Sequence, residues 1–273
     1  MKAFKEGLLA VLFLTGLFAA PAAPAQTLGF YGRVNHWTES RAELAKELRL
    51  MQRYGVDGYM IEMAGWAESA GWNDEEAFRH IEKEYRYLLR QCRRRGLWLF
   101  VSIVNDNMGL GKYGDPGIPL EAVEEQAARL ARIIAEGGPD NVLVQPVAEV
   151  RTAAGARFEA FCKETLRGFR LVHNGRWGFP LSRPEGFFAR AVHPPHADFP
   201  VPVDAFVISD HGQFIPQLTR DGSLSGNADP EKVAAWLRKM QRQGVPVAGY
   251  YAFQRKTADP EALRVIGEVC HPR

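Results

Sequence analysis

The residues best placed for bond chemistry in this sequence are two carboxylates, Glu149 and Asp210, each directly after a short run of strand-forming residues. Cleavage of a glycosidic bond requires two carboxyl groups beside that bond, one as proton donor and one as nucleophile or base. The run 142–148 is largely apolar, and desolvation favours the protonated carboxyl that a donor needs. We therefore interpret Glu149 as the donor and Asp210 as the second carboxylate.

Both carboxylates also have a purely structural interpretation. Glu149 suits the start of a helix, where the macrodipole stabilises a negative charge. Asp210 suits an Asx-turn, because His211 and Gly212 follow it in a turn pattern. Each alternative is compatible with the residue types alone.

Polar and aromatic side chains follow the other strand-like runs, and their combination favours a sugar ligand. Sugar hydroxyls need paired polar partners, and the apolar faces of sugar rings stack on Trp and Tyr. We therefore expect an oligosaccharide or polysaccharide substrate. The candidates for binding it are Tyr31, Arg33, Asn35, His36, Trp37, Glu62, Trp66, Asn105, Asp106, Asn174, His211 and Tyr251.

A repeated segment indicates which elements position these residues. In each of the segments 48–56, 89–97 and 237–245, an amphipathic helix pattern with Leu-Arg ends at a Gly, and a strand-forming run follows. A weaker fourth copy spans 130–137 and leads into the run 142–148. Repeated helix, Gly turn and strand units are typical of a parallel sheet, whose chemistry lies at the carboxyl ends of the strands.

Eight strand-forming runs alternate with helical patterns along the chain. This number favours an α/β fold, a single (β/α)8 TIM barrel over residues 26–273, with an irregular segment around the sixth strand. An open doubly wound sheet is the alternative, weakened because Gly109-Leu110-Gly111 lacks the third Gly of a phosphate loop. The predicted strands are 28–34, 56–63, 97–104, 142–148, 169–173, 187–192, 205–209 and 245–253.

Residues 1–25 have the pattern of a secretory signal peptide. Lys2 and Lys5 precede the apolar run 8–20, which is shorter than the roughly 20 residues needed to span a bilayer, and Ala23-Pro24-Ala25 resembles a cleavage site. We expect cleavage before Gln26 and export to the periplasm or the exterior. An uncleaved anchor is the alternative.

The formal net charge is +2 for the whole chain, and removal of the signal brings it close to zero. A chain with this balance has no electrostatic footprint for nucleic acid or an anionic membrane. We expect the mature protein to act as a monomer on a sugar, without a nucleic-acid or membrane partner.

The cysteines give no sign of a metal or redox site. Cys92, Cys162 and Cys270 are odd in number and have no CxxC or CxxH neighbours, so we interpret them as buried apolar residues. No cofactor or metal is predicted. A metal-dependent hydrolase is a lesser alternative, because the first strand offers only His36 where such sites place a His-x-His pair. Ser-His-Asp chemistry ranks lower, since no G-x-S-x-G segment is present.

With this pattern of strand ends, the mature chain resembles the large retaining clan of barrel glycoside hydrolases. The resemblance implies an acid/base residue after the fourth strand and a nucleophile after the seventh. That clan usually has Asn-Glu after the fourth strand and Glu after the seventh, whereas this chain has Ala148-Glu149 and Ser209-Asp210. The segments 55–59 and 96–100 also look like those of other barrel glycosidases, so the resemblance indicates a class and no single family.

The two departures give a second hypothesis of a different kind. A sugar-binding barrel that has lost its catalytic pair would show changes of this type, because a barrel by itself does not imply activity.

Overall fold

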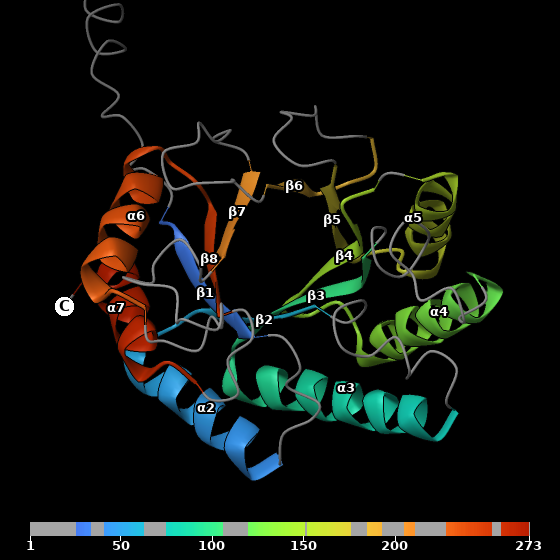
Figure 1. Cartoon of the computed structure of the whole chain (residues 1–273), viewed down its shortest axis with the longest axis horizontal. Helices are drawn as coiled ribbons and strands as arrows, with labels where there is room; N and C mark the ends of the chain where they lie inside the picture. The colour runs from blue at the N-terminus through green and yellow to red at the C-terminus, as the bar shows by residue number, and fades with distance from the viewer. Residues whose placement is uncertain are drawn as a thin grey trace, which may run out of the picture.

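Eight strands close into a parallel barrel in the computed structural model of the chain, with helices on its outer surface (Figure 1). The structure describes residues 26–33, 41–62, 75–105, 120–150, 152–175, 185–192, 205–210, 228–252 and 258–272. Each strand pairs with the next, and β8 pairs with β1 to close the barrel. The strands are β1 (Leu28–Arg33), β2 (Gly58–Glu62), β3 (Trp98–Asn105), β4 (Val142–Ala148), β5 (Arg170–Asn174), β6 (Ala189–Val192), β7 (Ala205–Asp210) and β8 (Val247–Ala252).

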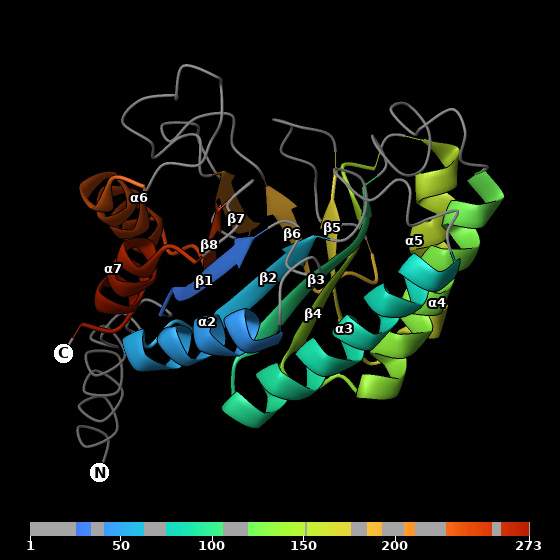
Figure 2. The ribbon, with the colours of Figure 1, turned by 60° about the horizontal axis from the view of Figure 1, so that its bottom comes forward.

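Helices separate most of these strands, as the alternating pattern predicts. Figure 2 shows the strand arrows pointing toward one end of the barrel and the helices packed along its side. Among the described residues between β5 and β7 there is a turn and the short strand β6 but no helix. The described helices are α2 (Arg41–Tyr54), α3 (Glu75–Arg95), α4 (Leu120–Gly137), α5 (Ala153–Thr165), α6 (Pro230–Arg242) and α7 (Pro260–Cys270). Within the described part of the chain, none of them is long and apolar enough to cross a membrane.

The repeated helix ends have the same backbone structure in all three strong copies. Gly55, Gly96 and Gly244 have φ values of 78°, 66° and 71°, in the left-handed region that glycine adopts at little cost. In each copy the Gly N–H donates to the carbonyl three residues before it, and the next N–H donates to the carbonyl five residues before its own residue. In the weaker copy α4 continues through Gly137, so Gly138 takes the left-handed conformation instead.

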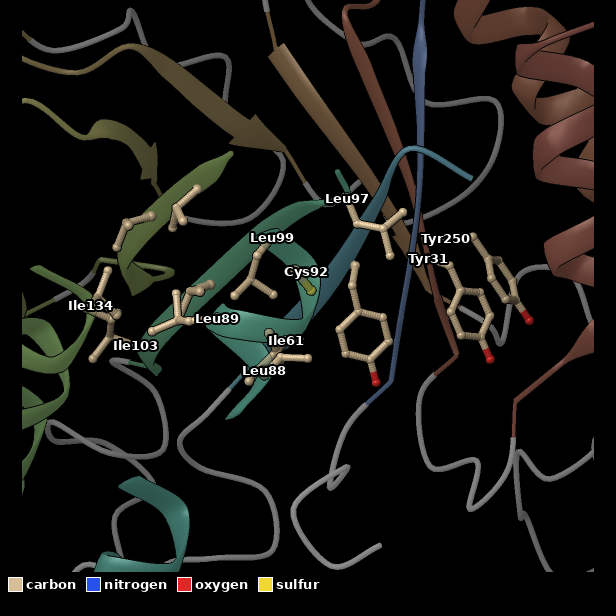
Figure 3. Close-up of a cluster of buried hydrophobic side chains, with 14 of the residues drawn as sticks. Tyr31, Ile61, Leu88, Leu89, Cys92, Leu97, Leu99, Ile103, Ile134 and Tyr250 are labelled. Atoms are coloured by element: carbon tan, nitrogen blue, oxygen red, sulfur yellow. The ribbon is translucent and has the colours of Figure 1, made fainter. Parts of the chain in front are cut away.

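The core has two layers, one between the barrel and its helices and one inside the barrel. Figure 3 shows part of the outer layer, where Tyr31 and Tyr250 lie side by side and Cys92 packs near Leu99. The barrel interior is filled by Phe30, Met60, Phe100, Leu143, Val172, Ala189, Ala191, Phe206, Ile208, Val247 and Tyr251. Side chains from alternate positions of each strand therefore pack inside, as expected for a small barrel.

Two glycines make room for the large interior side chains. A methyl group on Gly58 would lie 2.4 Å from the Phe30 ring, and one on Gly249 would lie 2.5 Å from the Met60 sulfur. Since heavy atoms cannot approach so closely, Phe30 and Met60 occupy the space that these two side chains would need.

All three cysteines are buried and free, as their sequence context predicts. Burial raises the pKa of the Cys92 and Cys270 thiols to about 12 each and also raises that of Cys162. A thiol that stays protonated is a poor nucleophile, because the thiolate is the reactive form.

We expect the native protein at pH 8 to resist alkylation by iodoacetamide, and all three thiols to react once the chain is unfolded. The unfolded thiols have a pKa near 8.5, well below the pKa of about 12 that Cys92 and Cys270 have in the folded protein. Unfolding therefore releases protons above that pH, and the free energy of unfolding should fall as the pH rises from about 8.5 toward 12. Intact-mass analysis and alkaline unfolding curves measure the two effects. Rapid labelling of the native chain would show that the thiols are accessible.

Candidate functional site

Residues at the carboxyl ends of the strands lie at one rim of the barrel, because all eight strands are parallel. Arg33, Glu62, Asn105, Asn174 and Asp210 are each the last residue of a strand. The backbone of Asp210 pairs with that of Tyr251, that of Glu62 with Ser102, and that of Asn105 with Ala148. The strand closure thus brings positions far apart in the sequence to a common rim. The predicted residues Asn35, His36, Trp37, Trp66, Asp106 and His211 lie outside the described residues.

Glu149, the predicted proton donor, has a backbone conformation that is rare for its residue type. It follows β4 directly, is half-buried, and has φ 55°. A left-handed conformation costs a residue with a Cβ atom about 1–2 kcal/mol relative to glycine. The surrounding contacts must supply that energy, and such outliers are concentrated at functional sites.

Asn174 at the end of β5 supplies two of these contacts. Its side-chain oxygen Oδ1 accepts a hydrogen bond from the Glu149 N–H at 3.3 Å, and its main-chain carbonyl accepts one from the Val150 N–H at 3.0 Å. Val150 and Gly175 form a parallel bridge just beyond them. The end of β5 therefore holds the chain directly after β4.

A chain of buried polar side chains continues from Asn174 into the barrel. The Asn174 amide nitrogen donates to Gln145 Oε1 at 3.3 Å, and Gln145 Nε2 donates to Ser102 Oγ at 3.0 Å. All three side chains are buried. Sequence reasoning missed Ser102 and Gln145, although a signal was present: each is a polar residue within an otherwise apolar strand, and a buried polar group needs a partner.

Tyr251 lies beside this polar chain, inside the barrel. Its side chain is buried and belongs to the interior layer. With Met60, Phe100, Ser102, Gln145 and Ile208 it lines a small interior cavity of about 10 Å³, roughly the room that one water molecule needs.

Tyr31 does not lie with these residues. Its side chain belongs to the outer layer, next to Tyr250, and its hydroxyl accepts a hydrogen bond from the Asp259 N–H at 2.9 Å. Because Phe30 points into the barrel and alternate residues of a strand face opposite sides, Tyr31 faces the helices. It anchors α7 to β1, and we leave it out of the site.

The structure thus brings together Glu149 and Asn174 after β4 and at the end of β5, with Gln145, Ser102 and Tyr251 beside Asn174 inside the barrel. They combine a carboxyl group on a fixed backbone with buried amides and a phenol, which suits positioned proton transfer at a polar ligand. Within the described ranges no cluster of three or more His, Cys, Asp or Glu side chains is arranged to hold a metal ion.

The strain at Glu149 predicts a gain of stability when it is relieved. We expect Glu149→Gly to raise the free energy of unfolding by about 0.5–1 kcal/mol, because glycine adopts φ 55° without a Cβ clash. The gain is smaller than the relieved strain, since glycine also makes the unfolded chain more flexible and so stabilises the unfolded state. Asn141→Gly is the matched control, since Asn141 has φ 56° at the opposite end of β4. Asn tolerates this conformation better, so its gain should be smaller. Urea unfolding measures both, and a loss of stability in Glu149→Gly would contradict the strain.

Comparison with known proteins gives matches by structure alone. No protein-family model and no curated sequence matches the chain. One solved structure, described as a glycoside hydrolase, is similar at 11% identity with a TM-score of 0.55, over 88% of this chain and 68% of the other. An endo-β-1,4-mannanase from Thermotoga petrophila is similar at 9% identity with a TM-score of 0.54, over 91% and 77%. A broad-specificity endoglucanase from an uncultured bacterium is similar at 13% identity with a TM-score of 0.50, over 83% and 84%. At such low identity these likenesses show the shared barrel fold.

Proposed function

We propose that this protein is a glycoside hydrolase that cleaves an O-glycosidic bond at the carboxyl-end mouth of its barrel. Glu149 donates the proton to the leaving oxygen, and Asp210 is the second carboxylate. The observation that carries the proposal is the strained left-handed backbone of Glu149, held at the end of β4 by the buried amide of Asn174. The structural alternative, a Glu stabilised by the dipole at the start of a helix, does not require a left-handed backbone.

Asp210 is proposed from its strand position. It comes two residues after Ile208, whose side chain packs inside the barrel, and alternation along a strand assigns both positions to the same face. Its backbone pairs with Tyr251, so the proposed second carboxylate belongs to a strand next to a described residue of the mouth. Two carboxylates at one mouth meet the requirement for glycosidic cleavage.

An oligosaccharide is the proposed substrate. Structurally similar proteins include a mannanase and an endoglucanase, and the predicted rim residues are of the types that bind sugar hydroxyls and ring faces. Glu62, Asn105 and Arg33 at strand ends are the proposed polar contacts. The signal-like residues 1–25 support export, so we propose that the enzyme acts on glycans outside the cytoplasm.

A non-catalytic sugar-binding barrel is the second candidate. Ala148 stands where the resembling clan has Asn, and Asp210 is one methylene shorter than the Glu of that clan, as expected where catalytic machinery has been lost.

An assay of the mature protein over a panel of mannans, glucans, xylans and aryl glycosides separates the two candidates. We expect release of reducing ends or of the aryl group from at least one member. Oligosaccharide binding by calorimetry without hydrolysis of any panel member would favour the binding protein and contradict the enzyme.

A further inference from the structure

One residue, Asn174, holds both peptide N–H groups that follow β4. Its side-chain oxygen takes the Glu149 N–H and its main-chain oxygen takes the Val150 N–H. The Glu149 N–H belongs to the peptide plane before Glu149, and the Val150 N–H belongs to the plane after it. Because both bonds go to the same rigid strand end, they fix the orientation of the two planes. This arrangement restrains the backbone from which the Glu149 side chain projects.

The direction of the Asn174 amide is set by its own partners. The Glu149 N–H can only donate, so it takes the Asn174 oxygen; the Asn174 nitrogen then donates to Gln145 Oε1, and the Gln145 nitrogen donates to Ser102 Oγ. A reversed Asn174 amide would place two donors against each other at Glu149 and two acceptors against each other at Gln145. Ser102 lies on β3, Gln145 on β4 and Asn174 on β5, so this series of hydrogen-bonded side chains extends across three strands.

From this geometry we propose that Asn174 is a positioning residue for Glu149 rather than a contact for the sugar, with Gln145 and Ser102 fixing its amide. The proposal rests on the proposed function of Glu149 as proton donor. Asn174 is 2% exposed, and its oxygen and one amide hydrogen are already engaged within the protein. A buried amide with these partners orients the donor, because proton transfer depends steeply on the placement of the carboxyl group.

Kinetics distinguish positioning from substrate binding. We expect Asn174→Ala to lower kcat about 100-fold on the best substrate of the panel while KM changes less than twofold. His173→Ala is the control: His173 is the preceding residue of β5, also buried, and bonds Glu159 of α5 at 2.8 Å on the helix side of the strand. It should destabilise the protein and leave kcat and KM near the wild-type values. A rise in KM with unchanged kcat, or no change in either constant, would overturn the proposal.

Asn174→Asp is the conservative variant for the case that Asn174→Ala does not fold. An aspartate keeps an acceptor for the Glu149 N–H, and Gln145 can turn its amide to donate to the new carboxylate while the Ser102 hydroxyl donates to Gln145. We expect kcat of Asn174→Asp to recover at least tenfold relative to Asn174→Ala, or to remain within tenfold of the wild type if the alanine variant is not obtained. A 100-fold loss in the aspartate variant, with KM unchanged, would show that the acceptor at Glu149 is not what matters.

Hydrogen exchange tests the same contacts without any assay of hydrolysis. In the wild type we expect slow exchange of the Glu149 and Val150 amides, measured by mass spectrometry on a peptide that spans them. Exchange of the Glu149 amide should accelerate at least tenfold in Asn174→Ala, which removes its acceptor, and should stay unchanged in the control His173→Ala. Unaltered exchange in Asn174→Ala overturns the positioning role, whereas altered exchange in a chain that hydrolyses no glycoside overturns the proposed function alone.

Discussion

Replacing Glu149 by glutamine is expected to lower turnover on an oligosaccharide by a factor of about 10²–10⁴ while leaving its binding almost unchanged. General acid catalysis contributes about this much, and glutamine keeps the size and polarity of the side chain but has no acidic proton to give. The Asn174 bond to the residue 149 N–H involves the backbone, so the variant retains it. Glutamine and glutamate have the same steric limits in the left-handed conformation, so the variant should keep this backbone.

Measurement of kcat together with the dissociation constant from calorimetry checks this expectation. Glu164→Gln is a matched control, because Glu164 is an exposed glutamate on α5 and should give wild-type values. If Glu149→Gln retained wild-type turnover, Glu149 would not be the donor. If it lost binding and turnover together, the residue would serve the sugar or the fold instead.

The second large effect concerns stability at the start of α7. We expect Asp259→Ala to lower the free energy of unfolding by about 3–4 kcal/mol and Asp229→Ala by about 1 kcal/mol. Both residues cap a helix that begins Asp-Pro-Glu, but Asp259 is completely buried and Asp229 is partly exposed.

The difference follows from what each carboxylate holds. Asp259 accepts hydrogen bonds from the Ala228 N–H at 3.0 Å and the Ala262 N–H at 3.1 Å, and both donors are buried. Alanine would leave these donors without their present partner and away from water. Asp229 accepts from the Glu231 and Lys232 N–H groups at the surface, where water replaces it. Urea unfolding of both variants measures the difference, and equal losses would contradict the role of burial.

The sequence predicted the barrel because its signals are local. Gly55, Gly96 and Gly244 mark helix ends through a backbone conformation that other residues avoid, and Asp229 and Asp259 mark helix starts through bonds to residues two or three positions away. Together with eight strand-forming runs, such local signals were enough to infer the barrel that the structure shows. The burial that separates Asp259 from Asp229 could not, because it depends on the start of α6 and on Tyr31, both distant in sequence.

The candidate site was predictable at the level of strand ends and less so at the level of side chains. Tyr31 was misplaced because Phe30 and Tyr31 are both aromatic, and a strand covered on both faces shows no alternation to reveal which side faces inward. The left-handed backbone of Glu149 has no local signal either, since that conformation is ordinarily associated with Gly or Asn. It depends on Asn174, 25 residues away.

The most direct test of Glu149 as proton donor compares two leaving groups on the same sugar. A dinitrophenolate leaves without protonation, whereas a sugar alkoxide needs a proton from the enzyme. The proposed role predicts that Glu149→Gln loses a factor of about 10²–10⁴ in bond cleavage on the oligosaccharide and less than about tenfold on the dinitrophenyl glycoside, each measured as a single turnover. Equal losses on both substrates, or a loss on neither, would contradict it.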